Sequence, residues 1–259
     1  MHLIKFVLIA IFLFPLSFSA NQHKKPVLYI IGDSTVKNGD GKNNNVLQGW
    51  GSFIDEFFDT AKISVQNHAI GGRSSRTFIS DGRWDRILAN LQKGDYVIMQ
   101  FGHNDAGALD DTSRARGTIK GIGVDSIKIY NPILKKEEQV HTYGWYLGKY
   151  IEDAKSKGAI SIVCSPIPRN DWKDGKVLRS NDGYALWARQ VAENNGAYFI
   201  DLNNKLADEY ENIGMEKTGS FFPKEHTHTN KEGAVFNAGI VVQNVKSLRK
   251  CKLKKFLKD

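Results

Sequence analysis

A serine follows directly on an apolar run near the start of the chain. Residues 26–31 (Pro-Val-Leu-Tyr-Ile-Ile) predict a buried strand, and Gly32, Asp33, Ser34 and Thr35 come next. Open α/β sheets place their sites at the carboxyl ends of the strands, so a hydroxyl at this point could act as a nucleophile. The alternative is structural, because aspartate, serine and threonine also cap turns and helices. Three later stretches favour the chemical interpretation.

A histidine near the end of the chain is the candidate base for this serine. A serine hydroxyl is a weak nucleophile until a base accepts its proton. His228 lies just before the last predicted helix, where a loop can return its imidazole to the ends of the strands. Glu225, three residues earlier, could orient the ring and stabilise the imidazolium. The alternatives are that Glu225 is a surface acid and His228 a capping residue.

The same segment raises the question of a metal. His226 and His228 are two residues apart and could bind one ion together. A zinc site needs at least three protein ligands, and the sequence indicates no third ligand near these two histidines. We therefore expect no metal and no other cofactor.

Acyl transfer also requires hydrogen-bond donors for the oxyanion. Gly72 can present its backbone N–H closely because it has no side chain, Asn104 can add an amide, and the Ser34 N–H would be a third donor. Each of these residues could instead belong to an ordinary turn or cap. All three stretches follow predicted strands, and this makes the purely structural interpretation much weaker.

Strand and helix patterns alternate along the chain. Further strands are predicted at residues 62–67, 95–101, 159–164 and 197–200. Helices are predicted at residues 50–59, 84–92, 143–157, 182–194 and 231–248. Such alternation predicts an α/β fold with a parallel sheet covered on both faces.

The segment of residues 106–140, which we name the insertion, breaks this rhythm. It is polar and rich in glycine, and its second half reads as two short runs joined by a turn at Asn131-Pro132. We expect a surface hairpin after the third strand. Long insertions of this kind often bind ligands or cover a site, and a merely decorative loop is the alternative.

The first 20 residues are typical of a secretory signal peptide. Lys5 precedes the apolar run of residues 6–14, and small residues follow at Ser17, Ser19 and Ala20. We expect cleavage there, one domain over residues 21–259, a secreted or periplasmic protein, and no membrane attachment after cleavage. Cys164 and Cys251 are the only cysteines, and whether they pair is open.

The chain is basic, with a formal net charge of +8, or +7 without Lys5. This balance favours acidic partners. Residues 246–258 hold seven lysines and arginines, which we interpret as a solvated helix end. No nucleic-acid recognition motif accompanies the charge, so nucleic acid is not an expected partner. The oligomeric state is left open.

The four stretches together resemble the SGNH, or GDSL-type, hydrolases. The matching residues are Gly32-Asp33-Ser34, Gly72, Gly102-His103-Asn104-Asp105 and His228. Residues 67–78, 100–105 and 226–229 are similar, more narrowly, to the rhamnogalacturonan acetylesterases. The α/β-hydrolase motif G-x-S-x-G does not fit, because Val36 stands in place of its second glycine.

The resemblance implies a flavodoxin-like three-layer α/β/α sandwich, a metal-independent mechanism and removal of acetyl esters from pectin. Members of the family usually carry aspartate three residues before the histidine, and Glu225 departs from that pattern. The resemblance therefore implies that a glutamate takes the place of the aspartate as the third member of a triad.

Two arginines follow the glycine that is expected to bind the oxyanion. Arg73 and Arg76 could pair with the galacturonate carboxylates of pectin, or could tie their loop to neighbouring groups. We expect a secreted serine esterase acting on an acetylated acidic polysaccharide, rhamnogalacturonan above all. The alternatives are an acetylxylan esterase, a lipase or phospholipase on the same scaffold, and a carbohydrate-binding module without catalysis.

Overall fold

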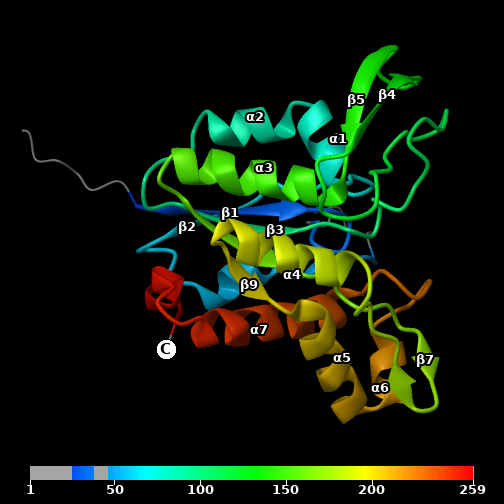
Figure 1. Ribbon diagram of the computed structural model, residues 1–259. Coiled ribbons are helices and arrows are strands. Elements are labelled where there is room, and N and C mark those ends of the chain that lie inside the picture. The colour runs from blue at the N-terminus through cyan, green and yellow to red at the C-terminus, as the bar shows by residue number, and fades with distance from the viewer. Residues whose placement is uncertain (1–24, 38–45, 259) are drawn as a thin grey trace, which may run out of the picture.

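A five-stranded parallel sheet forms the centre of the computed structural model, which describes residues 25–37 and 46–258 (Figure 1). The strand order is β2-β1-β3-β6-β9, the flavodoxin-like order. The strands are β1 (Val27–Gly32), β2 (Ser64–Asn67), β3 (Tyr96–Gln100), β6 (Ile160–Cys164) and β9 (Tyr198–Ile200). This confirms the predicted fold class. The proposed signal peptide of residues 1–20 lies outside the described residues.

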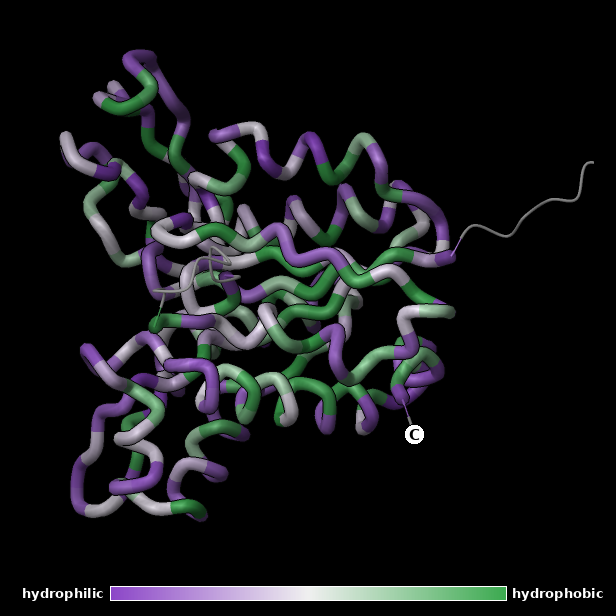
Figure 2. Tube along the Cα trace, turned by 180° about the vertical axis from the view of Figure 1, so that it is seen from behind, coloured by the Kyte–Doolittle hydropathy of each residue, from purple (hydrophilic) through white to green (hydrophobic). Residues whose placement is uncertain are grey.

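Helices cover both faces of this sheet. The helices are α1 (Ser75–Ser80), α2 (Arg83–Leu88), α3 (Tyr143–Ser156), α4 (Tyr184–Asn195), α5 (Leu202–Ile213), α6 (Met215–Ser220) and α7 (Lys231–Ser247). Short 3₁₀ helices are η1 (Trp50–Ser52), η2 (Ile54–Phe57) and η3 (Lys252–Phe256). Hydrophobic residues gather in the central strands, and polar residues dominate the outer loops (Figure 2).

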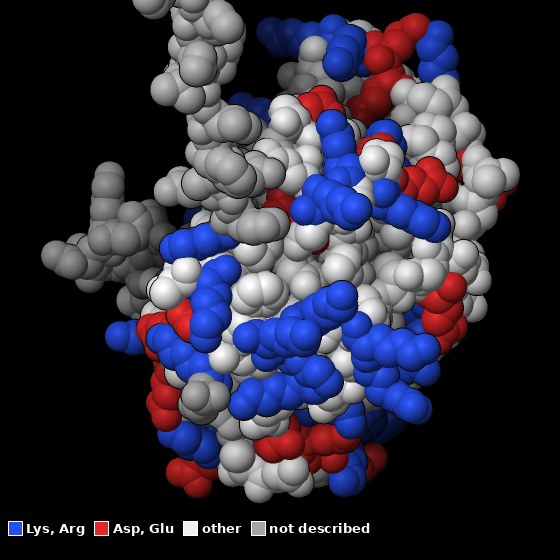
Figure 3. Space-filling model, turned by 90° about the vertical axis from the view of Figure 1, so that its left-hand side faces the viewer, with Lys and Arg blue, Asp and Glu red and all other residues white. Residues whose placement is uncertain are grey.

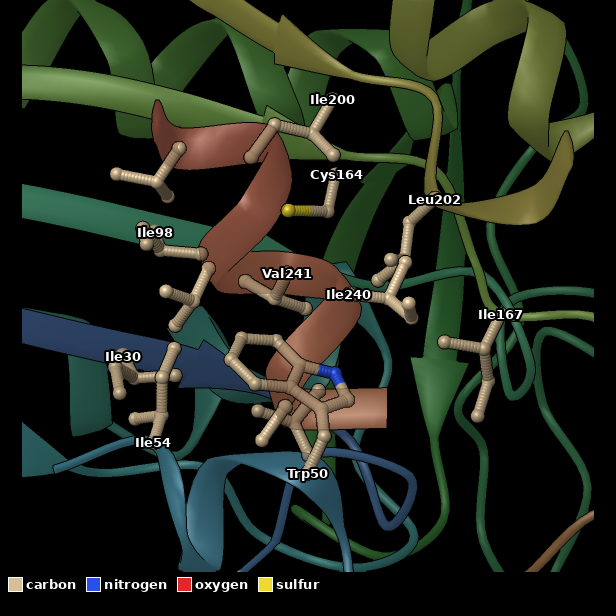
Figure 4. Close-up of a cluster of buried hydrophobic side chains, with 14 of the residues drawn as sticks. Ile30, Trp50, Ile54, Ile98, Cys164, Ile167, Ile200, Leu202, Ile240 and Val241 are labelled. Carbon is tan, nitrogen blue, oxygen red and sulfur yellow. The ribbon is translucent and has the colours of Figure 1, made fainter. Parts of the chain in front are cut away.

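Alternate residues of each central strand supply two separate cores. In β1, Tyr29 and Ile31 pack with residues of α1 to α4, whereas Leu28 and Ile30 face the other side. On that side, isoleucines and a cysteine from four strands meet η1, α5 and α7 (Figure 4). Because successive side chains in a strand point to opposite faces, a continuously apolar strand is the pattern that a doubly covered sheet requires.

Some helices differ from the sequence prediction. The predicted helix at residues 50–59 is the pair of short turns η1 and η2, and α2 ends at Leu88. We did not predict α5, although the signal is in the sequence. Asp201 caps the helix by accepting from the backbone of Asn204, and Leu202, Leu206 and Tyr210 recur at helical spacing on its buried side.

The insertion contains the expected hairpin. Its strands are β4 (Ser126–Asn131) and β5 (Lys136–His141), paired antiparallel, and they project from the body of the molecule (Figure 1). Two further short strands, β7 (Trp172–Lys173) and β8 (Lys176–Val177), form a small hairpin between β6 and α4. No helix in the described part of the chain is long and apolar enough to cross a bilayer.

The basic residues near the C-terminus lie at the end of the molecule away from the carboxyl ends of the strands. Leu253 of η3 is buried and Leu257 bridges to Phe58, so this segment packs onto the core. Its seven lysines and arginines are exposed, and Figure 3 shows the basic side chains gathered on this side. Cys164 and Cys251 are buried free thiols and do not pair.

Candidate active site

Ser34 lies in the turn that leaves β1 at its carboxyl end. Gly32 allows this turn, because a Cβ there would lie 2.6 Å from the carbonyl oxygen of Gln100 on β3. The buried carboxylate of Asp33 then accepts hydrogen bonds from the backbone N–H and the hydroxyl of Thr35, at 2.9 and 2.8 Å. The two neighbours of Ser34 are thus fixed, and its own side chain reaches the cleft described below.

The hydroxyl of Ser34 is linked to a histidine and an acid from the far end of the sequence. Ser34 Oγ lies 2.6 Å from His228 Nε2, and His228 Nδ1 lies 2.5 Å from Glu225 Oε1. Because a carboxylate accepts, Nδ1 carries the proton that it donates to Glu225, and Nε2 is left to accept from the serine hydroxyl. This is the geometry that activates a serine nucleophile.

Glu225 is held by its own loop. Its carboxylate accepts the backbone N–H groups of Thr227 and His228, at 2.8 and 2.9 Å. Partial burial opposes ionisation, but the hydrogen bond with His228 and these two N–H donors hold the pKa of Glu225 below its ordinary value. Glu225 thus contacts the imidazole of His228 although it stands three residues earlier, at the position where SGNH hydrolases usually have aspartate.

The expected oxyanion donors line the same cleft as Ser34 and His228. Gly72 has φ +77°, a conformation that favours glycine. Among the described residues, neither the Ser34 N–H nor the Gly72 N–H donates to a protein acceptor. The Asn104 amide donates one hydrogen to Arg73 O at 2.9 Å, which leaves its second hydrogen available. Three donors of the described residues are thus free on residues that line the cleft together with Ser34.

A buried polar network behind Ser34 was not predicted from the sequence. Trp50 Nε1 donates to Gln100 Oε1 at 2.9 Å, and the Gln100 amide donates to the hydroxyl of Thr35 at 2.5 Å. His103 Nδ1 lies 3.3 Å from Asp33 Oδ2, and its Nε2 lies 3.1 Å from Ile167 O. The charge of His103 and the bonds from Thr35 overcome burial and keep the pKa of Asp33 below its ordinary value.

Asp105, next to Asn104, is a second buried acid that the sequence argument left without a role. Its Oδ1 accepts from the backbone N–H and the hydroxyl of Ser75, at 3.1 and 2.5 Å, and so joins the end of β3 to the start of α1. Burial raises the pKa of Asp105 to about 7, with a further contribution from the charge of Asp33.

The two arginines expected to contact substrate have protein partners instead. Arg76 is fully buried, where it forms a two-pronged ion pair with Glu138 on β5 and donates to the carbonyls of Leu109 and Gly117. The expectation that Arg76 binds a carboxylate of the substrate is therefore wrong, since solvent does not reach it. Arg73 lines the cleft but forms an ion pair with Asp81 at 2.6 Å.

His226 and His228 have different partners, so the structure does not place them as a joint pair of ligands. His226 Nδ1 lies 2.7 Å from Asp171, whereas both ring nitrogens of His228 contact Ser34 and Glu225. Within the described residues no three histidine, cysteine or acidic side chains group as metal ligands. That no metal takes part in the reaction stays a prediction, which activity after dialysis against EDTA tests.

The cleft around Ser34 has a volume of about 700 Å³ and is mostly polar. The insertion forms part of its wall, through residues of the loop before β4 and of the turn between β4 and β5. A second cavity of about 350 Å³ adjoins it, because His103 and Arg169 line both. Ser34 thus lies in a cleft that, together with the adjoining cavity, has more space than one small ligand would fill.

Comparison with known proteins agrees with this geometry. The profile of the GDSL-like lipase/acylhydrolase family matches residues 30–234. A rhamnogalacturonan acetylesterase of Emericella nidulans is 33% identical over 208 residues, which cover 80% of this chain and 79% of that protein. A probable rhamnogalacturonan acetylesterase of Bacillus subtilis, YesY, is 32% identical over 227 residues, covering 85% and 93%.

Solved structures share the fold. The crystal structure of YxiM from Bacillus subtilis superposes with a TM-score of 0.70 at 26% identity, covering 86% of this chain, and this chain spans only 57% of that protein. An acetylxylan esterase from Geobacillus stearothermophilus superposes with a TM-score of 0.56 at 16% identity, covering 85% and 94%. At 16% identity, the similarity to the acetylxylan esterase concerns the fold alone. By its sequence and its architecture, this chain belongs to the GDSL-like lipase/acylhydrolase family.

Proposed function

We propose that this protein is a serine esterase that removes acetyl groups from a plant cell-wall polysaccharide, with rhamnogalacturonan as its substrate. The observation that carries the proposal is the hydrogen-bonded set Ser34–His228–Glu225, which opens on a wide polar cleft. The relatives named as rhamnogalacturonan acetylesterases support this choice of polymer.

The geometry gives each member of the set a role. Ser34 Oγ attacks the acetyl carbonyl carbon while His228 Nε2 accepts its proton. The imidazolium then gives that proton to the sugar oxygen as the C–O bond breaks, and an acetyl-enzyme remains. His228 next takes a proton from water as the water oxygen attacks the acetyl group, and acetic acid leaves as the proton returns to Ser34; the acid then ionises to acetate in solution. Glu225 keeps the ring oriented and stabilises its cation throughout.

The oxyanion formed in both halves of the reaction is assigned to three donors. They are the backbone N–H groups of Ser34 and Gly72 and the second hydrogen of the Asn104 amide. Fixed donors of this kind stabilise charge that develops in the transition state more than they stabilise the ground state.

The lining of the cleft supports a sugar polymer over a lipid. Its apolar side chains are few, mainly Ala115, Ile133 and Leu134, and they stand among charged and polar ones. A long acyl chain would leave those polar groups desolvated without partners, at a cost in binding free energy. We further propose that residues 1–20 direct secretion or periplasmic export, and that residues 21–259 act as one domain on this acidic substrate.

The test measures acetate release from acetylated rhamnogalacturonan and acetylated xylan, and p-nitrophenol release from p-nitrophenyl esters of short and long acids. We expect release from rhamnogalacturonan to be fastest among the polymers, and Ser34→Ala to lower kcat by about 10⁴-fold or more. Ser156→Ala is the matched control, since Ser156 is exposed at the end of α3 and its hydroxyl, within the described residues, donates to the backbone carbonyl of Asp153. A Ser34→Ala protein with normal activity would exclude the mechanism, and a preference for long-chain esters would exclude the substrate.

A further inference from the structure

Three arginines of the cleft differ from Arg73 and Arg76 in having no acidic partner. Arg114, Arg116 and Arg169 line the cavity that contains Ser34 and His228. Within residues 25–37 and 46–258, none of these three guanidinium groups forms an ion pair, whereas Arg73 pairs with Asp81 and Arg76 with Glu138. Among the arginines that line the cleft in the described residues, these three are therefore the ones whose charge no acid engages in an ion pair.

Arg114 and Arg116 are carried by a rigid turn of the insertion. The Asp111 carboxylate accepts the backbone N–H groups of Ser113, Arg114 and Ala115 and the hydroxyl of Ser113. These four bonds hold the pKa of Asp111 at about 2 and leave its carboxylate engaged within the turn. Ala115 has φ +41°, a conformation that is strained for a residue with a side chain and persists only where its surroundings impose it.

The two guanidinium groups of this turn lie close enough to repel each other. Partial burial, followed by the positive charge of Arg114, lowers the pKa of Arg116 from its ordinary value, although the charges of Asp111, Asp105 and Asp33 act in the opposite direction. Arg116 Nη1 lies 3.4 Å from the carbonyl oxygen of Gly72, the residue assigned to the oxyanion. A bound anion would relieve the repulsion, and it would lie beside the reacting ester.

Arg169 lies at the junction of the two cavities. Its loop is fixed on both sides, because Asn170 N donates to His226 O at 2.7 Å and the Ile167 carbonyl lies 3.1 Å from His103 Nε2. Arg169 lines both cavities, whereas Arg114 and Arg116 line only the larger one. Arg169 is thus carried by a fixed loop at the point where the two cavities meet.

We propose that these three guanidinium groups bind the carboxylates of uronic acid residues in the polysaccharide. Arg114 and Arg116 form one carboxylate site within the larger cavity, and Arg169 forms a second at the junction with the smaller cavity. A guanidinium matches a carboxylate with two parallel N–H bonds, which gives geometric selection as well as attraction. The inference rests on the proposed function and deepens it, since it names the groups that select an acidic polymer over a neutral one.

The test compares one polymer in two forms. Acetylated rhamnogalacturonan is used as it is and after its uronic acid carboxyls have been converted to neutral primary amides, and kcat/KM for acetate release is measured on both with the full chain. We expect the natural protein to prefer the acidic form. Arg169→Gln and the double variant Arg114→Gln with Arg116→Gln should each lower that preference about tenfold, mainly through KM. Added salt should lower it in the natural protein and less in the variants.

Controls separate the two proposals. Arg249→Gln removes the same charge from the exposed C-terminal segment and should leave the preference intact. Equal rates on the two polymer forms by an active natural protein would overturn the arginine sites and leave the acetylesterase proposal standing. No acetate release from either form would overturn both. If Arg116→Gln alone lowers kcat equally on both forms, Arg116 positions Gly72 and does not select the substrate.

Discussion

The two ends of the central sheet both carry positive charge, but in different ways. At the carboxyl end, Arg76 is buried against Glu138 and Arg73 pairs with Asp81, while three other arginines line the cleft. At the amino end, the basic residues of the C-terminal segment are exposed in a broad patch (Figure 3). The net charge of the sequence does not distinguish these cases. An arginine is available to bind substrate only if no acidic side chain of the protein already pairs with it.

The largest expected effect at the carboxyl end, after loss of the nucleophile, belongs to Glu225. Glu225→Gln keeps the size of the side chain but removes the negative charge that fixes the tautomer of His228, so we expect kcat to fall by roughly 10³–10⁴-fold. Glu225→Asp should keep substantial activity. Steady-state kinetics, with circular dichroism as the check on folding, decide the point. A Gln variant with near-normal kcat would leave a Ser34–His228 pair acting alone.

Asn104→Ala should have the next largest effect. Its amide serves the transition state, so we expect kcat to fall on the order of 10²–10³-fold with little change in KM. The measurement is kcat and KM for p-nitrophenyl acetate and for acetylated rhamnogalacturonan. A rise in KM at constant kcat would instead make Asn104 a binding residue.

Asp105→Asn should change the pH dependence of stability. The pKa of Asp105 is about 7 in the folded protein, above its ordinary value of 3.8, so the folded state binds more protons between these pH values. Its ionisation therefore lowers the free energy of unfolding as pH rises from about 4 to about 7, and no further above that. The Asn variant lacks this loss, so its stability relative to the natural protein should rise across that range, by at most about 1.4 kcal/mol per pH unit.

Urea unfolding of both proteins at pH 4.5, 5.5, 6.5 and 7.5 measures the difference. Because the other titrating groups are common to both proteins, their contributions largely cancel. Stability curves that stay parallel over this range would show that Asp105 is ionised in the folded protein at low pH.

The smallest effect is expected at the opposite end. Replacing Lys252, Lys254 and Lys255 together by serine removes three exposed charges. The six residues of β1 separate this end from Ser34 by roughly 20 Å, about twice the screening length in 0.1 M salt. We expect kcat/KM on the acidic polymer to change by less than about twofold. A loss as large as that of Arg169→Gln would show that both ends contact the polymer.

The sequence allowed prediction of the residues whose positions follow from the sheet itself. Ser34 and Asn104 lie in the loops that follow β1 and β3, and adjacent parallel strands bring their carboxyl ends together. The hairpin of the insertion was also predictable, because alternation and the turn at Asn131-Pro132 are local signals. Pairing Ser34 with His228 and Glu225 required a further inference. It came from the place of His228 before the last predicted helix and from the three-residue spacing between Glu225 and His228.

What the sequence did not reveal depends on contacts between distant segments. The partner of Arg76 is 62 residues away on β5, and nothing near Arg76 indicates that it is buried. Arg116 and Arg169 reach the cleft because their loops are tied elsewhere, through Gly117 N to Ala108 O and Asn170 N to His226 O. Such ties are set by the packing of whole elements, so local patterns could not identify these residues.

The loop that holds Glu225 has a consequence for how the enzyme matures. Glu225 and His228, the proposed acid and base, lie within four consecutive residues, whereas Ser34, the proposed nucleophile, is 194 positions before His228 in the chain. Residues 48–50 connect the two parts, since Gln48 pairs with Thr229 and Trp50 N donates to Thr35 O. A nascent chain therefore carries Ser34 and the proposed oxyanion donors long before it carries His228, the proposed base. In the proposed mechanism catalysis requires that residues 225–228 dock beside Ser34, so the first turnover of a refolding sample would report that these two distant parts have joined.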